Sequence, residues 1–313
     1  MPFFMDESTA KIKFEKGALT FSQQIELLES RGMVFDDKAK AERYLSNISY
    51  YRLSAYWFTF LEHPSTDHKF RPGTRFEQVI STYVFDRKLR LLIFDEIERI
   101  EIAFRTQLIY SFAHAHGNNW YEDVSLFIDE EGFSEAHTLL VADMEKSREK
   151  FIPHYKGKYG EPTNPPCWMA LEIASMGWLS IIYKNLRGGN AKKQVAEHFF
   201  LDDTVFISWL QLLCYLRNTC AHHSRLWNRG MQAKLKFPQL PMRPWLSVMP
   251  VGQHRFRLYT ALAAIFYLLK GFLHDSSFAK KLKELLDEYP ELPRHYMGFP
   301  ERWEEDPFWQ LKS

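Results

Sequence analysis

Arg217, Asn218 and His222 lie within six residues of one another at the end of a strongly apolar segment. A histidine accepts and donates protons near neutral pH, and a guanidinium can bond two phosphate oxygens at once. Because RNA carries its own nucleophile, the 2′-hydroxyl, these groups could cleave RNA without a metal. The chemistry predicts His222 as the base and Arg217 as the cation that stabilises the phosphate. Asn218 would hold either His222 or the scissile phosphate.

The same residues also have a purely structural interpretation. His222 and His223 could together bond the last carbonyl groups of a helix. Arg217 could form an ion pair with Glu98 or Glu101, and such a pair would not exclude a catalytic role.

Charge is unevenly distributed around these residues. Residues 204–274, the basic block, contain nine Lys or Arg and no Asp or Glu, whereas residues 106–145, the acidic block, contain eight acids and no Lys or Arg. The basic block either attracts a polyanion such as RNA or docks against the acidic block within the fold. In the first case Arg225 and Arg229, together with His223, are RNA-binding rather than catalytic residues.

A helix over residues 206–223 must position these groups. Its apolar residues fall in one stripe about 120° wide, the usual buried face of a helix. Arg217 falls inside this stripe and points about 140° away from His222 in a straight helix. The two can share one site only if the arginine wraps around the helix or the helix ends near Cys220. The expected buried residues are Phe206, Trp209, Leu210, Leu213, Leu216 and Cys220, and the expected polar side comprises Ser208, Gln211, Tyr215, Asn218, Thr219 and His222.

The pattern Arg-Asn-x-x-Ala-His at 217–222 resembles the R-x4-6-H signature of HEPN ribonucleases. The longer run at 217–229 is similar to the Abi-like abortive-infection family (AbiD/AbiF). Two more stretches carry the same resemblance, namely residues 47–57, with Ser-Tyr-Tyr-Arg-Leu-Ser, and residues 83–105, with Phe-Asp-Arg-Lys-Leu-Arg. Three separated motifs in this order make the resemblance specific, and it extends over about residues 20–230.

This resemblance implies a metal-independent endoribonuclease that acts as a phage-defence toxin, with Arg217, Asn218 and His222 as its catalytic residues. It also suggests how acid and base are both supplied, because HEPN proteins pair as homodimers in which two Arg/His motifs face one cleft. An antitoxin or a regulatory noncoding RNA is a further partner that the resemblance allows. The alternative is a non-catalytic RNA-binding or protein-interaction module on the same scaffold.

The pattern of helical signals predicts an all-α fold, a HEPN-type helical bundle with additional N- and C-terminal helices. We expect an N-terminal helical region at residues 1–75 and a core with the Arg/His motif at residues 76–235. A C-terminal helical extension is expected at residues 236–313.

Four local features refine this fold. Residues 20–23 form a capping-box pattern that opens a helix. Residues 76–116 show one long apolar periodicity, and a helix of that length is expected to contain a break. Gly177 is expected to divide the segment that follows Pro166 into two short helices. The aromatic residues within 50–61 favour a helix, and we expect them to pack in a core rather than stack on bases.

The cysteine pattern and the hydropathy limit which classes of protein and which cell compartments fit the sequence. Three cysteines without a Cys-x-x-Cys pair predict reduced thiols, and no histidines or carboxylates show the spacing of a zinc site. The N-terminus lacks the pattern of a secretory signal. The longest largely apolar segment, residues 258–269, has 12 residues, which suits a core helix and not a membrane span. We therefore expect a cytoplasmic protein without metal, cofactor or membrane partner.

Overall fold

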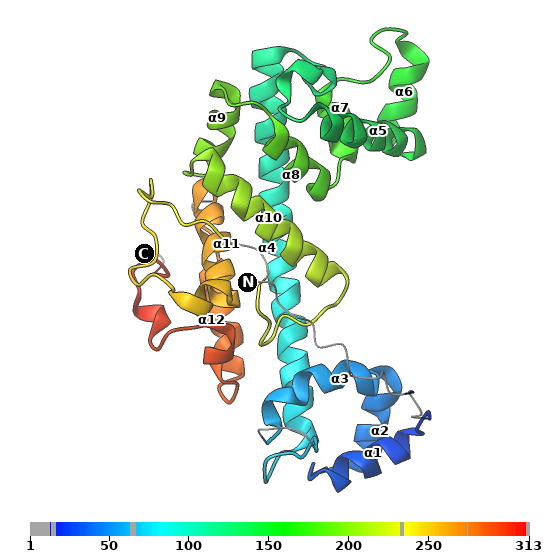
Figure 1. Cartoon of the computed structure of the whole chain (residues 1–313), viewed down its shortest axis with the longest axis vertical. Helices are drawn as coiled ribbons and strands as arrows, with labels where there is room; N and C mark the ends of the chain where they lie inside the picture. The colour runs from blue at the N-terminus through cyan, green and yellow to red at the C-terminus, as the bar shows by residue number, and fades with distance from the viewer. Residues whose placement is uncertain (1–12, 14–16, 63–66, 232–234, 274, 311–313) are drawn as a thin grey trace, which may run out of the picture. The chain divides into compact units, whose positions relative to one another are not determined.

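The computed structural model describes residue 13 and residues 17–62, 67–231, 235–273 and 275–310 of the chain. Twelve α-helices make up its regular structure, and these residues contain no strand (Figure 1). The prediction of an all-α fold is therefore confirmed. By its internal contacts the chain divides into two compact units, Met1–Tyr83 and Val84–Ser313. The three regions predicted from the sequence stay a prediction.

The first unit begins with α1 (Phe21–Ser30) and α2 (Lys38–Asn47), which pack against each other. The predicted capping box of α1 is confirmed. The Thr20 hydroxyl accepts a hydrogen bond from the Gln23 N–H at 3.3 Å, and the Gln23 side chain accepts one from the Thr20 N–H at 2.9 Å. The carboxylate of Asp37 caps α2 in the same way, at 2.9 Å from the third N–H of the helix.

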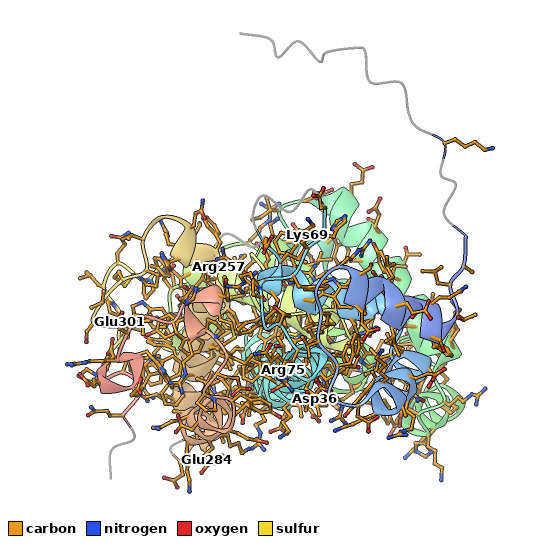
Figure 2. All side chains as sticks on the ribbon, turned by 90° about the horizontal axis from the view of Figure 1, so that it is seen from below. Asp36, Lys69, Arg75, Arg257, Glu284 and Glu301 are labelled. Carbon is orange, nitrogen blue, oxygen red and sulfur yellow. The ribbon has the colours of Figure 1, made fainter. Side chains whose placement is uncertain are left out.

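The loop before α2 is tied to the start of α4. The Val34 N–H donates to the Thr74 carbonyl at 2.8 Å, and the Phe76 N–H donates to the Val34 carbonyl at 2.9 Å. An ion pair between Arg75 and Asp36, both labelled in Figure 2, lies beside these bonds. Both side chains of the pair are about half exposed, so the backbone bonds are the more important part of this connection.

The aromatic segment forms α3 (Tyr50–Trp57) and a 3₁₀ turn (Phe58–Phe60), so the helix prediction is confirmed for most of its length. Tyr56 and Trp57 are buried, as expected for core residues. Tyr51 and Phe58 are the exceptions, because they are 87% and 51% exposed.

The longest element, α4 (Phe76–His116), is one unbroken helix of 41 residues, so the predicted break is wrong. No proline or glycine interrupts the segment, and a continuous apolar stripe is buried along it. Gly117 ends the helix with a φ of +90°, which glycine adopts at little cost. The stripe consists of Phe85, Leu89, Ile93, Ile97, Ile100, Phe104 and Leu108, all of them fully buried.

The second unit packs shorter helices against α4. Two short helices after Pro166 are confirmed, but their break lies at Ala174 and Ser175. Gly177 is inside a helix instead, because the Ser175 hydroxyl caps that helix by accepting from the Trp178 N–H at 3.2 Å. The helices are α5 (Glu130–Lys146), α6 (Phe151–Lys158), α7 (Cys167–Ile173), α8 (Met176–Asn185), α9 (Asn190–His198), α10 (Asp203–Ala221), α11 (Leu258–Phe272) and α12 (Phe278–Glu288).

The helix that carries the Arg/His motif, α10, crosses α4 obliquely in Figure 1. Near its start, the Phe206 ring meets the Phe104 ring at 5.5 Å, and the loop after its end bonds to Asp86. On another side, α10 packs on α11, where the Trp209 ring lies 5.4 Å from the Tyr267 ring. Residues 258–269 of α11 are all buried, which confirms the predicted core helix.

Helix length and hydropathy together limit what could cross a membrane. Among the described residues, no single helix is long and apolar enough to do so. Within the same residues, only α9 and α10 taken together, bent by 59° at their junction, reach that length and composition.

Candidate functional site

The buried face of α10 matches the predicted stripe, but the predicted polar side contains two errors. Ser208 and Thr219 are buried. Each hydroxyl donates to a carbonyl of its own helix at 2.8 Å, Ser208 to Val205 and Thr219 to Tyr215, so neither needs water. The six residues of the stripe, each at most 6% exposed, are Phe206, Trp209, Leu210, Leu213, Leu216 and Cys220.

The last turn of α10 is followed directly by the two histidines, His222 and His223. The helix ends at Ala221, and His222 is its C-cap. His223 has a φ of +55°, and its N–H donates to the Cys220 carbonyl at 3.0 Å. The next N–H, of Ser224, donates to the Thr219 carbonyl at 2.9 Å. This is a Schellman motif with histidine where glycine is usual, and it leaves both histidines exposed.

Arg217 reaches toward the side of the helix that carries the other predicted catalytic residues. Its guanidinium donates to the side-chain oxygen of Asn218 at 3.4 Å. The carbonyl of Asn218 accepts the His222 N–H at 2.9 Å, and the two side chains share one side of the helix because they are four residues apart. Arg217 is half-buried, whereas Asn218 and His222 are exposed. The end of α10 therefore carries Arg217 in contact with Asn218, and Asn218 and His222 on one side of the helix.

The ion pair that was the structural alternative for Arg217 does not form among the described residues. Glu101 pairs with Arg105 instead, at 2.9 Å, and Glu98 is exposed. Within the part of the chain that the structure describes, no carboxylate forms an ion pair with Arg217. Arg105 also approaches Glu172 of α7 at 3.9 Å, so it links Glu101 on its own helix with a second helix. The guanidinium of Arg217 keeps donors that a phosphate could use.

The loop after the histidines is held from α4 by a buried carboxylate. One oxygen of Asp86 accepts the Leu226 N–H at 3.0 Å and the Trp227 N–H at 2.6 Å. The other oxygen accepts a hydrogen bond from Arg90, one turn further along α4. Asp86 is fully buried and Arg90 is 5% exposed, and the side chains of the two loop residues that they hold are buried as well.

Sequence reasoning did not assign a role to Asp86 or Arg90. A signal was present, because an acid and a base four residues apart interrupt the apolar stripe of α4 at positions where burial is expected. The spacing could not identify the partner of Asp86, because the two N–H groups that bond to it belong to residues 140 and 141 positions further along the chain.

The predicted RNA-binding arginines lie beside this loop, and both are half-buried. Arg229 donates to the Arg225 carbonyl at 3.3 Å, and its guanidinium lies 5.6 Å from the centre of the Tyr215 ring. Other members of the basic block also contact carbonyls or rings. Arg257 donates to the Asn228 side chain at 3.1 Å, and Arg255 lies over the Phe237 ring. Lys234 lies outside the described residues.

The cysteines near the motif are poor nucleophiles. All three cysteines of the chain are free thiols, as predicted. Burial raises the pKa of the Cys220 thiol to about 12, and burial also raises the pKa of Cys214. A thiol with a raised pKa is protonated near neutral pH and is therefore a weak nucleophile. Among the described residues, no three His, Cys, Asp or Glu side chains form a group that could hold a metal ion.

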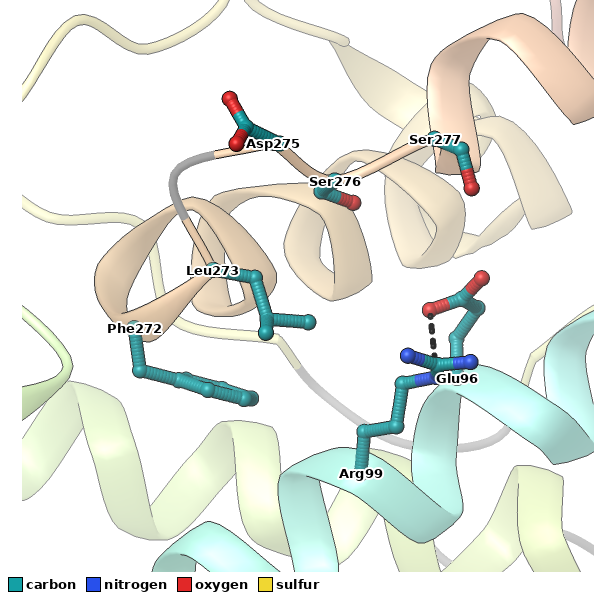
Figure 3. A pocket seen from close by; sticks show the side chains of 7 residues that line it. All are labelled: Glu96, Arg99, Phe272, Leu273, Asp275, Ser276 and Ser277. Atoms are coloured by element: carbon teal, nitrogen blue, oxygen red, sulfur yellow. Dashed lines mark ion pairs between the residues drawn. The ribbon is translucent and has the colours of Figure 1, made fainter.

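A depression of about 300 Å³ between α4 and the α11–α12 connection contains none of the predicted site residues (Figure 3). The carboxylate of Glu96 lies at its edge, 3.6 Å from both Arg99 and Lys281. Burial raises the pKa of Glu96 above its ordinary value. The depression is lined by Glu96, Arg99, Phe272, Leu273, Asp275, Ser276 and Ser277.

Comparison with known proteins gives a match to a protein family. A family model described as Abi-like protein matches residues 43–228, which is more than half of the chain. The match extends from α2 to the loop held by Asp86 and includes the whole Arg/His motif. No curated protein and no solved structure matches the chain.

Proposed function

This chain belongs to the Abi-like protein family, which points to abortive-infection defence against phage, and from that premise we propose that it is an endoribonuclease toxin. The proposed site is the last turn of α10, with Arg217, Asn218 and His222 acting on RNA. No metal takes part in the proposed reaction.

The observation that carries this proposal is the burial of Arg217 together with its hydrogen bonding. A half-buried guanidinium that has no carboxylate partner in the described part of the chain is costly unless another polar group meets it. Here it donates to the Asn218 side chain at 3.4 Å, beside an exposed histidine. An RNA phosphate would satisfy the remaining donors in a bidentate arrangement.

The proposed reaction begins when His222 takes the proton of the 2′-hydroxyl. The 2′-oxygen then attacks the adjacent phosphorus, and the bond from phosphorus to the 5′-oxygen breaks. A protonated histidine gives a proton to the leaving 5′-oxygen, so the products are a 2′,3′-cyclic phosphate and a 5′-hydroxyl. Arg217 stabilises the negative charge that develops on the phosphate oxygens, and Asn218 orients His222 or the phosphate.

A second copy of the chain completes the site in this proposal. One histidine cannot easily act as base and acid in the same cleavage, and the resemblance to HEPN proteins suggests a homodimer with two motifs in one cleft. An exposed apolar face on α4 is consistent with such pairing. It consists of Leu91, Phe94 and Ile102, which share one side of the helix by their spacing and are 57%, 37% and 52% exposed.

Regulation belongs to the same proposal, because a toxin that cleaves host RNA must be held silent. An antitoxin or a regulatory noncoding RNA would meet this need. The basic block around the motif offers a regulatory RNA of this kind a surface for its phosphates.

Cleavage of a labelled RNA by the purified protein in EDTA tests the proposal directly. We expect the wild type and His254→Ala to cleave, and His222→Ala to fail. His254 is an exposed histidine outside the motif and is the matched control. If all three proteins bind RNA equally and none cleaves it, the chain is a non-catalytic RNA-binding protein. Toxicity of the same three proteins on overexpression in the host provides a parallel readout.

A further inference from the structure

Asp86 and Arg90 are separated from the motif by more than 120 residues, yet they fix the chain that leaves it. The segment from His222 to Trp227 is held at both ends. At one end, the Ser224 N–H is bonded to the Thr219 carbonyl within the helix terminus. At the other, the Leu226 and Trp227 N–H groups are bonded to Asp86.

We infer that Asp86 is a positioning residue for the Arg/His site, and that Arg90 keeps the Asp86 carboxylate in place for that role. This inference rests on the proposed function, since it concerns the same cleavage reaction. The backbone of the held segment carries His222, His223 and Arg225, so its direction determines where their side chains lie. A catalytic group displaced by about 1 Å can lose about a hundredfold in rate.

The chemistry of the pair explains why a carboxylate occupies this position. Two adjacent N–H groups point at one oxygen, and a carboxylate oxygen has lone pairs for both. A buried carboxylate needs an opposite charge, which Arg90 supplies from one turn away on the same helix. The Asp86 oxygen therefore positions the segment, and the positive charge of Arg90 offsets the free energy lost by burying the Asp86 carboxylate.

Two double variants separate the acceptor from the charge. Asp86→Asn with Arg90→Met removes the ion pair and keeps a side-chain oxygen for the two N–H groups. Asp86→Leu with Arg90→Met removes the ion pair and the oxygen, with a side chain that has the same number of non-hydrogen atoms as asparagine. Replacing both members of a buried pair by uncharged residues often preserves stability, whereas removal of one member strands a buried charge.

We expect the single-turnover cleavage rate of the asparagine variant to stay within about threefold of the wild type. The rate of the leucine variant should fall by about tenfold or more, with the Kd for RNA changed by less than about threefold in both. Amide hydrogen exchange of residues 223–229 should become faster only in the leucine variant. Lys192→Met is the matched control, because Lys192 is another buried cation that holds backbone carbonyls, those of Lys184 and Leu186.

Equal cleavage rates in the two double variants would overturn the inference. A reduction in the Lys192→Met protein as large as in the leucine variant would also overturn it, because the effect would then be general destabilisation. Absence of cleavage by the wild type is a different result, which removes the proposed function. Hydrogen exchange would still report in that case whether Asp86 holds the segment.

Discussion

Arg217 donates a hydrogen bond to the side chain of its neighbour Asn218 at 3.4 Å, although the two residues lie about 100° apart around the helix. The long side chain thus bends from the edge of the buried face toward the side where His222 lies. Helical geometry alone placed Arg217 and His222 about 140° apart. The contact with Asn218 draws the guanidinium toward this side of the helix.

His222→Ala should separate catalysis from stability. His222 is exposed at the helix end, so we expect the free energy of unfolding to change by about 1 kcal/mol or less. Cleavage should fall by about a hundredfold or more, the usual effect of removing a positioned acid or base. Thermal melts and cleavage assays measure the two quantities, with His254→Ala as control. An unfolded variant, or one that cleaves RNA at the wild-type rate, would contradict the assignment.

Arg217→Ala should cost less stability than a buried ion pair would. Breaking a buried pair costs about 3–5 kcal/mol, but Arg217 is half-buried and has no carboxylate partner among the described residues. We expect a change of about 1 kcal/mol together with loss of cleavage. Arg217→Lys keeps the charge and removes the bidentate geometry, so its activity should lie between those of the alanine variant and the wild type. A lysine variant as active as the wild type would show that the fork geometry is not used.

The proposed chemistry predicts how the products end. Cleavage should persist in EDTA, because the nucleophile is the 2′-hydroxyl and the proton carriers are histidines. The product should carry a 2′,3′-cyclic phosphate or its hydrolysis product, which mass spectrometry distinguishes. A strict Mg²⁺ requirement with 3′-hydroxyl products would exclude this mechanism.

Neutralising Arg225 and Arg229 should weaken RNA binding by a similar factor for every sequence tested. The dependence of log Kd on log salt should flatten by about 0.7 to 0.9 for each RNA phosphate that the variant no longer neutralises. Titrations at several salt concentrations measure this slope. Neutralising Lys146 and Lys280, two exposed lysines outside the basic block, is the control. An unchanged slope would mean that these arginines serve the fold rather than RNA.

Mixed dimers test whether two chains share one cleft. A dimer with Arg217→Ala in one chain and His222→Ala in the other should retain no more than a fraction of wild-type activity if each cleavage uses both motifs. Co-expression with two affinity tags yields such dimers, and single-turnover assays measure them. Full activity in the mixed dimer would show that its chains act independently.

The features predicted correctly from the sequence are those set by local pattern. The capping box at Thr20 and the buried face of α10 both follow from spacing along one helix. The break expected within α4 did not occur, because length alone was the argument and the apolar stripe continues without proline or glycine. Ser208 and Thr219 were predicted on the polar side of the helix because their side chains are polar. Their hydroxyls instead donate to carbonyls of the same helix, which allows both residues to be buried.

Contacts between distant segments were beyond such reasoning. Glu98 and Glu101 were reasonable partners for Arg217 by charge, but Arg105 lies one turn from Glu101 on the same helix and binds it first. Asp86 could be recognised as an unusual acid in an apolar stripe. Its bonds to the Leu226 and Trp227 N–H groups depend on how α4 and the end of α10 pack, which periodicity does not specify.

The 140 residues between Asp86 and Leu226 also set an order of events during synthesis. At about 5 to 20 residues per second, Asp86 leaves the ribosome roughly 7 to 28 seconds before the segment that it holds. Until then the nascent chain contains a carboxylate and a guanidinium with no loop to bind. A polypeptide that stops short of Leu226 lacks the two N–H groups that Asp86 accepts, so it cannot assemble the held segment.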